Sequence, residues 1–334
     1  MSNNKYQLSN EEELNNNFSS NINDFWKTHA KVELFESKHG GTINTVHITK
    51  KHSNSKAMVI SPGRTESALK YKELAFDLYN QGYDIFVIDH RGQGNSSRLS
   101  IDTHRGHVED FQYYVTDLKT FVDSLQLTKH YQTSFLLSHS MGGAISALYL
   151  EEQAHPFQAA AFFSPMLSIN LRGLPVFLAK IISYVSDRSC RIFGKKDCNA
   201  PGSKIYNPIT FDKNLLTSSS KRYCSMLATF NESIETQLGG PTMRWVNESL
   251  YAMERAIKNA VNIDIPVIII QSGADAVVSA KGQKQFFNKI KHNKSNDFLS
   301  ISGAKHELLI EQDKYRLPAL TAALNFFEQY SKGK

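Results

Sequence analysis

The sequence has few cysteines and no long apolar run, and each absence excludes a class of protein. Its three cysteines, Cys190, Cys198 and Cys224, form an odd set without paired metal-ligand spacing. They predict neither a disulfide framework nor a zinc site, so we expect all three to be reduced and structural. A helix needs about 20 consecutive apolar residues to span a bilayer. No stretch of the sequence approaches that length, which excludes a membrane-spanning helix.

The sequence also shows no export signal, no internal repeat and no nucleic-acid-binding motif. The polar, Asn-rich stretch from Met1 to Asn21 has no charged end leading into an apolar run, so it does not resemble a secretory signal and predicts a cytoplasmic protein. Positive charge is dispersed and no nucleic-acid motif appears, which argues against a nucleic-acid partner. The formal charge of +6 is a mild excess that favours anionic surfaces, such as the inner face of the cytoplasmic membrane.

What the sequence does have is a regular alternation of short β-branched runs and longer helical patterns. A chain of 334 residues with 41% hydrophobic residues can bury a sizeable core. The alternation predicts an α/β fold with a mostly parallel sheet of eight strands and helices on both faces. The expected strands are 32–35, 42–48, 57–60, 85–89, 134–138, 159–163, 266–271 and 298–301. The expected helices are 68–81, 110–125, 141–153, 280–291 and 315–330. The basic, Ser-rich stretch 50–56 is expected to be a hairpin loop.

One interruption breaks this alternation. Between about Leu167 and Met253 the sequence becomes helical and irregular, with turns such as Gly239-Gly240-Pro241. We therefore expect an inserted helical cap at 167–253, a core built from 23–166 and 254–334, and a polar N-terminal segment at 1–22.

The chemistry begins at Ser140. The apolar run Phe135-Leu136-Leu137 leads into Ser138-His139-Ser140-Met141-Gly142-Gly143, and a helical stretch follows. A strand, a tight turn and a helix, with small residues two before and two after the serine, are typical of a nucleophile elbow. Ser138 and Gly142 fill those small positions, so Ser140 is the expected nucleophile.

A serine nucleophile needs a histidine base and an acid to orient it. Asp275 follows the late apolar strand 266–271, and His306 follows the last strand. Because catalytic residues of open α/β sheets gather at the carboxyl ends of strands, Ser140, Asp275 and His306 are predicted to form a triad. Asp264 and Asp297 are rival acids, but each precedes its strand and would lie at the wrong end of the sheet.

The tetrahedral intermediate also needs two N–H donors. The backbone N–H of Met141, directly after the nucleophile, is the first. The second is expected from Arg64, in the loop after the third strand, where Gly63 lets the backbone approach the substrate. Ser67 is expected to cap the next helix. Asp89, His90 and Arg91 are expected to form a local hydrogen-bond network, and His139 is expected to point away from the base position.

These motifs resemble the monoacylglycerol-lipase-like branch of the α/β-hydrolases, and most of all its bacterial lysophospholipases. The matching strings are 62–67 (Pro-Gly-Arg-Thr-Glu-Ser), 89–94, 106–108, 139–146, and 240–242 with Trp245. Pro62 stands where many relatives have His, and Ser138 replaces the usual first Gly of the elbow. We expect Gly63 and Trp245, within these strings, to contact the substrate.

The resemblance implies hydrolysis of a lysophospholipid ester, or transfer of its acyl group to another lipid, without a metal or cofactor. A monoacylglycerol lipase or carboxylesterase is the alternative. A cap-bearing aminopeptidase would need acidic cap residues such as Glu232, Glu235 or Glu248, and a catalytically inactive binding protein would lack part of the triad. The apolar stretch Leu174 to Val185 precedes a basic cluster. It either rests on an anionic membrane or, as we prefer, packs the cap onto the core.

Overall fold

The computed structural model describes residues 5–14, 16–50 and 56–331. Eight strands form a single sheet in the order β1-β2-β4-β3-β5-β6-β7-β8. β2 runs antiparallel to both of its neighbours, and the other pairs are parallel. This confirms the predicted mostly parallel sheet. The strands are β1 (Ala30–Glu36), β2 (Thr42–Ile48), β3 (Lys56–Ser61), β4 (Tyr83–Ile88), β5 (Ser134–His139), β6 (Ala159–Phe163), β7 (Val267–Ser272) and β8 (Asp297–Ile301).

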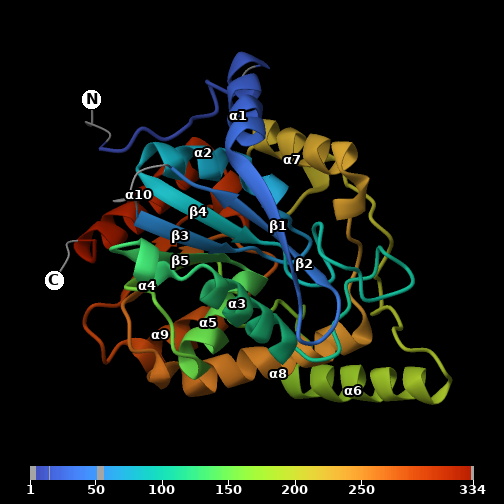
Figure 1. Ribbon diagram of the computed structural model, residues 1–334. Coiled ribbons are helices and arrows are strands. Elements are labelled where there is room, and N and C mark those ends of the chain that lie inside the picture. The colour runs from blue at the N-terminus through green and yellow to red at the C-terminus, as the bar shows by residue number, and fades with distance from the viewer. Residues whose placement is uncertain (1–4, 15, 51–55, 332–334) are drawn as a thin grey trace.

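Helices cover both faces of the sheet because its central strands are apolar on both sides. Every residue of β4, β5, β6 and β7 is buried, as expected of parallel strands between helical layers. α1 (Asn16–His29), α2 (Lys72–Asn80) and α10 (Asp313–Gln329) pack on one face. α3 (Gln112–Ser124), α5 (Met141–Glu152), α8 (Met243–Asn259) and α9 (Ala280–Ile290) pack on the other. Figure 1 shows the two layers above and below the strands.

The N-terminal helix was not apparent from the polar sequence. α1 begins at Asn16, inside the stretch expected to be a polar N-terminal segment, and buries Ile22 and Trp26. Two apolar residues one turn apart are enough to hold a helix on a packed face even when its other positions are polar. The short helix α4 (Leu127–His130) was also not expected. The loop expected at 50–56 lies largely outside the described residues.

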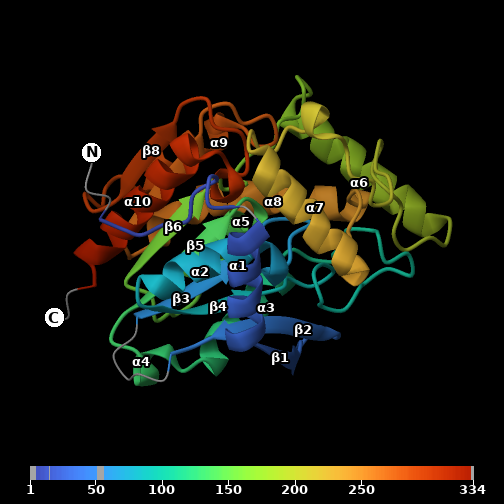
Figure 2. The ribbon, with the colours of Figure 1, turned by 90° about the horizontal axis from the view of Figure 1, so that it is seen from above.

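The connection between β6 and β7 carries the helices expected for a cap. α6 (Val176–Ile192), α7 (Ser220–Glu232) and α8 gather on one side of the molecule in Figure 2, beside the sheet. The limits 167–253 stay a prediction. Among the described residues, no helix has both the length and the apolar character needed to cross a membrane.

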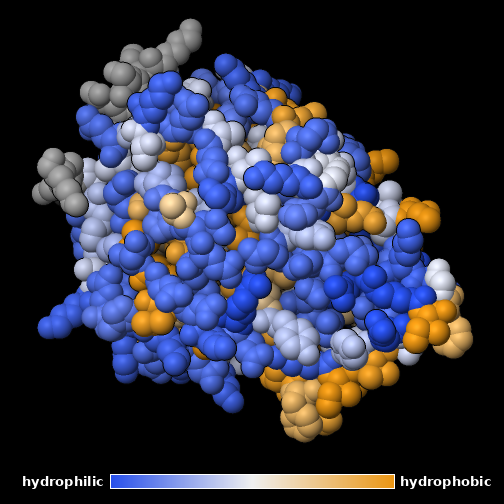
Figure 3. Space-filling model, turned by 60° about the horizontal axis from the view of Figure 1, so that its bottom comes forward, coloured by the Kyte–Doolittle hydropathy of each residue, from blue (hydrophilic) through white to orange (hydrophobic). Residues whose placement is uncertain are grey.

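The apolar side chains of α6 do not pack the cap onto the core, so the preferred expectation is wrong. The apolar residues of this stretch are exposed, with Phe177 at 63% and Ile181 at 54%; they are Leu174, Val176, Phe177, Leu178, Ile181, Ile182 and Val185. The buried side of α6 is made of small and polar residues instead. Ser183 hydrogen-bonds to Asn247 of α8, and Asp187 pairs with Arg244. Because polar pairs hold α6 on α8, its apolar side is left facing outward, as the orange region along the lower right of Figure 3 shows.

The expectation of three reduced cysteines is also wrong. Cys190 and Cys198 form a disulfide, and Cys224 is free and exposed. Gly194, with a φ of 75°, reverses the chain after α6, and the Lys195 N–H donates to the carbonyl of Cys190. This reversal brings Cys198 back beside the last turn of the helix. The spacing of the cysteines in the sequence did not indicate this disulfide. The cytoplasmic location stays a prediction.

Candidate active site

Ser140 lies at a strained turn between β5 and α5. Its backbone has φ 49° and ψ −116°, a conformation that non-glycine residues rarely adopt. The turn is tight because β3 passes close to the start of α5: a Cβ on Gly142 would lie 2.0 Å from the carbonyl oxygen of Ser61. Only glycine fits there. The local sequence thus holds the Ser140 hydroxyl at the carboxyl end of the sheet, as a nucleophile elbow requires.

The structure brings Ser140, His306 and Asp275 together from three strand ends. His306 Nε2 lies 2.9 Å from Ser140 Oγ, and its Nδ1 lies 2.7 Å from Asp275 Oδ2. Asp275 is fixed in turn, because its Oδ1 accepts the backbone N–H groups of Val277 and Val278. This arrangement lets the imidazole take the serine proton while the carboxylate fixes its tautomer and stabilises the imidazolium that forms.

The two expected oxyanion donors lie at the start of α5 and in the neighbouring loop. Met141 is the first residue of the helix, where backbone N–H groups have no intrahelical acceptor. Neither its N–H nor that of Arg64 meets an acceptor in the part of the chain that the structure describes. The Glu66 carboxylate accepts a hydrogen bond from the Gly63 N–H, and Gln93 Nε2 donates to the Gly63 carbonyl. These bonds fix the loop shape and leave the Arg64 N–H unused.

The two residues expected to contact substrate have structural contacts in this state. Both polar backbone groups of Gly63 are engaged by Glu66 and Gln93. Trp245 is buried in the first turn of α8, and its ring lies 5.1 Å from the Arg64 guanidinium carbon. Gly63 therefore shapes the oxyanion loop and Trp245 supports the Arg64 side chain. Direct contact of either residue with substrate stays a prediction.

A buried charged cluster beneath the triad was missed by sequence reasoning. Lys70 forms ion pairs with Glu66 at 2.7 Å and with Glu307 at 2.5 Å. His139 Nδ1 lies 2.8 Å from Glu66, and its Nε2 lies 3.3 Å from the carbonyl of His306. The cluster therefore joins the loop that carries Gly63 and Arg64 to the segment that carries His306. The only sequence signals were Glu66, within the 62–67 string, and Glu307, next to His306.

The electrostatics of this cluster follow from its burial and its opposite charges. Burial opposes the ionised form of Glu66, but Lys70 and His139 outweigh it and hold the pKa of Glu66 well below its usual value. Burial also opposes protonation of His139, and the carboxylates of Glu307 and Glu66 overcome it and raise the pKa of His139.

The same three groups, Glu66, His139 and Glu307, are close enough to hold a metal ion, since their ligand atoms lie within 4.8 Å of one another. The Lys70 ammonium already occupies this site between the two carboxylates. A second cation there would face direct repulsion. We therefore assign the cluster a structural role.

The loop after β4 forms the hydrogen-bond network expected of it. Asp89 accepts N–H groups from Ala68 and Asn95, and Arg91 pairs with Asp117 at 2.7 Å. One detail differs from expectation. Ser67 stands at the N-cap of η1 (Ala68–Tyr71), but its hydroxyl makes no capping bond and the Asp89 carboxylate takes that role.

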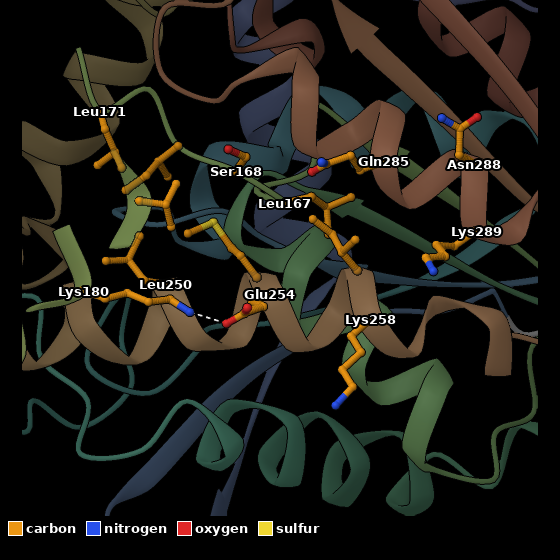
Figure 4. Close-up of a pocket in the computed structure, with 14 residues that line it drawn as sticks. Leu167, Ser168, Leu171, Lys180, Leu250, Glu254, Lys258, Gln285, Asn288 and Lys289 are labelled. Carbon is orange, nitrogen blue, oxygen red and sulfur yellow. Dashed lines mark hydrogen bonds and ion pairs between the residues drawn. The ribbon is translucent and has the colours of Figure 1, made fainter. Parts of the chain in front are cut away.

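Two mostly apolar cavities flank the segment that follows β6. One, of about 580 Å³, lies between Leu167, α8 and α9. Figure 4 shows Leu167, Leu171 and Leu250 lining it, with the Lys180–Glu254 ion pair beside them. The other, of about 760 Å³, lies between the same segment and the cap, and extends to Gly239. Both offer apolar walls to an acyl chain.

Comparison with known proteins relates this chain to a hydrolase family by sequence and to solved structures by fold. The family model described as serine aminopeptidase, S33, matches residues 52–313. The chain is 34% identical over 317 residues to lysophospholipase L2 of Escherichia coli, covering 93% of this chain and 91% of that protein. It is 28% identical over 231 residues to the monoglyceride lipase of Mus musculus, covering 68% of each. A soluble variant of the Saccharomyces cerevisiae monoglyceride lipase, solved with a substrate analog, has the same fold, with a TM-score of 0.72 at 18% identity over 91% of this chain and 96% of that one.

Proposed function

Since the chain belongs to the serine aminopeptidase S33 family of α/β-hydrolases, together with the bacterial lysophospholipases L2, we propose that it hydrolyses the acyl ester of lysophospholipids. The chain is a serine ester hydrolase of the lysophospholipase and monoglyceride lipase group. The observation that carries the proposal is the contact of His306 with both Ser140 and Asp275, at 2.9 and 2.7 Å.

The reaction proceeds in two halves through an acyl-enzyme. Ser140 Oγ attacks the ester carbonyl while His306 Nε2 takes its proton, and the N–H groups of Arg64 and Met141 stabilise the oxyanion. His306 then gives the proton to the departing glycerol oxygen. In the second half, His306 activates a water that releases the fatty acid and restores the Ser140 hydroxyl. A lipid hydroxyl in place of this water would give acyl transfer instead.

The surface of α6 supports the proposal that the substrate is delivered from a membrane. The exposed apolar side of α6 lies next to the exposed cations Arg188, Lys195 and Lys196. An apolar helix face beside basic residues binds the interface of an anionic membrane. We therefore include a peripheral contact of α6 with such a membrane in the proposal.

Among the alternatives, a monoacylglycerol lipase is favoured by the murine relative and the yeast structure, whose names specify that activity. The positions of the acidic cap residues disfavour an aminopeptidase. Glu248 pairs with Arg244 and accepts the Phe111 N–H, while Glu232 and Glu235 are exposed. None of these three contacts the triad in the described structure. An inactive binding protein is disfavoured by the complete triad geometry.

The deciding experiment measures fatty-acid release from lysophosphatidylethanolamine and from monoacylglycerol with the same acyl chain. Higher kcat/KM on the phospholipid supports the proposal, and hydrolysis of the neutral lipid alone would replace it with a monoacylglycerol lipase. Ser140→Ala should lower turnover by at least about 10³-fold. Ser146→Ala is the matched control, because Ser146 is buried in α5, which follows Ser140, and its hydroxyl has no hydrogen-bond partner among the described residues.

A further inference from the structure

Arg64 is half-buried, and unlike the buried arginines Arg91, Arg222 and Arg316 it has no carboxylate partner among the described residues. Arg91 pairs with Asp117 at 2.7 Å, Arg222 with Glu73 at 2.9 Å, and Arg316 with Asp77 at 2.6 Å. Across residues 5–14, 16–50 and 56–331, no Asp or Glu lies within ion-pair distance of the Arg64 guanidinium. A cation withdrawn from water without a counter-charge costs stability, so this site can gain from an incoming anion.

The Arg64 side chain is held between Gly239, Gly106 and Trp245, which together form a cradle around its guanidinium. Its Nη2 donates to the carbonyl of Gly239 at 2.6 Å, and its guanidinium carbon lies over the Trp245 ring, 5.1 Å from the ring centroid. A Cβ on Gly106 would lie 2.4 Å from Nη2, so glycine lets the guanidinium approach the backbone closely at this position. The Arg64 Nε is buried and has no acceptor among the described residues. Part of the guanidinium's bonding capacity is therefore free.

The cradle is made by two of the strings that carry the family resemblance. Gly106 donates its N–H to the carbonyl of Gly240 and accepts the N–H of Thr242. Thr242 caps α8, which places Trp245 in the first turn of that helix. The 106–108 string and the 240–242 string are thus joined around one side chain. Burial lowers the pKa of Arg64 to about 10, and the guanidinium stays charged at neutral pH.

We propose that the Arg64 guanidinium binds the phosphodiester of the lysophospholipid and so selects it over neutral monoacylglycerol. This inference rests on the proposed function. The planar guanidinium donates two parallel hydrogen bonds to phosphate oxygens, which an uncharged glycerol hydroxyl does not match. One residue then has two roles: its backbone N–H faces the oxyanion and its side chain faces the head group.

Molecular dimensions support this double role. The number of covalent bonds from the Arg64 backbone nitrogen to its guanidinium carbon equals the number from the acyl carbonyl carbon of a 1-acyl lysophospholipid to its phosphorus. At about 1.5 Å per bond the two spans match. A substrate whose carbonyl oxygen meets the Arg64 N–H can therefore extend its phosphate as far as the same residue's guanidinium extends.

The test compares two substrates with the same acyl chain, lauroyl lysophosphatidylethanolamine and monolauroylglycerol. Arg64→Met should lower the ratio of kcat/KM for the phospholipid over the neutral lipid by about 10- to 100-fold, the range of charged hydrogen bonds. Arg64→Lys should restore part of it, since it keeps the charge and loses the planar fork. Arg244→Met is the control, because Arg244 lies next to Trp245 but has its own carboxylate partners. It should leave the ratio unchanged.

A binding measurement keeps the inference testable if the Arg64 variants lose all activity. In a Ser140→Ala background, Arg64→Met should weaken calorimetric binding of the phospholipid about tenfold relative to the neutral lipid. An equal effect on both lipids, or none, overturns the inference. Inorganic phosphate and glycerophosphoethanolamine serve as competitors. Competition by inorganic phosphate alone would show an anion site unrelated to the head group and would also overturn it.

Failure of the proposed function looks different in these assays. It would appear in the wild-type protein as hydrolysis of the neutral lipid without hydrolysis of the phospholipid. Failure of the inference would appear as phospholipid hydrolysis whose substrate ratio does not respond to Arg64.

Discussion

At the scale of single residues, the two oxygens of Asp275 have separate tasks. Oδ2 faces His306 Nδ1, whereas Oδ1 accepts two backbone N–H groups of its own loop. Asp275→Asn keeps an oxygen for the loop but loses the negative charge beside the imidazole. We expect turnover to fall by about 10⁴-fold, because the imidazole is then held in the wrong tautomer, with little change in melting temperature. Steady-state kinetics and thermal unfolding check both parts.

The control for this variant is Asp264→Asn. Asp264 is largely exposed and pairs with His155, away from the triad. The turnover of the Asp264→Asn variant should remain at the wild-type value. Near-normal activity of Asp275→Asn would reject Asp275 as the triad acid.

At the scale of elements, α6 combines a polar buried side with an apolar exposed side. Phe177, Ile181 and Val185 are each more than half exposed. If they enter a membrane interface, each contributes about 1 kcal/mol, so replacing all three by Ser should weaken binding to phosphatidylglycerol vesicles roughly a hundredfold. Vesicle sedimentation measures this. Hydrolysis of a short soluble ester should not change.

Val32→Ser with Leu34→Ser is the matched control for α6. Both residues are 63% exposed on the edge strand β1. If this pair weakens vesicle binding as much as the α6 triple variant, membrane contact is not localised to α6 and that part of the proposal fails.

At the scale of the whole molecule, the Glu66–Lys70–His139–Glu307 cluster links segments that are far apart in the chain. Lys70 and Glu307 are separated by 237 positions. Because the pKa of Glu66 is depressed in the folded protein, its stabilisation is present above about pH 4.5 and is lost as the pH falls. The pKa of His139 is raised, so its contribution is present below about pH 6.5 and is lost as the pH rises.

Glu66→Gln should therefore lower the free energy of unfolding by about 3 kcal/mol at pH 6, the usual cost of breaking a buried ion pair. The difference from wild type should shrink between pH 5 and pH 3, as the carboxyl group becomes protonated in the unfolded chain. Urea unfolding at several pH values measures it. The exposed residue Glu12 provides the control variant Glu12→Gln. A difference that stays constant down to pH 3 would contradict the assigned charge.

The sequence by itself determined the sheet and the positions of Ser140, Asp275 and His306. Strand periodicity and tight turns are local signals, and the carboxyl ends of parallel strands necessarily share one edge. The tertiary structure alone decided which partners meet across long separations. It placed Lys70 between two acids and left Arg64 without an acid partner among the described residues. It also turned the apolar side of α6 outward and paired Cys190 with Cys198. Each depends on which side chains become neighbours in space, and no local pattern specifies that.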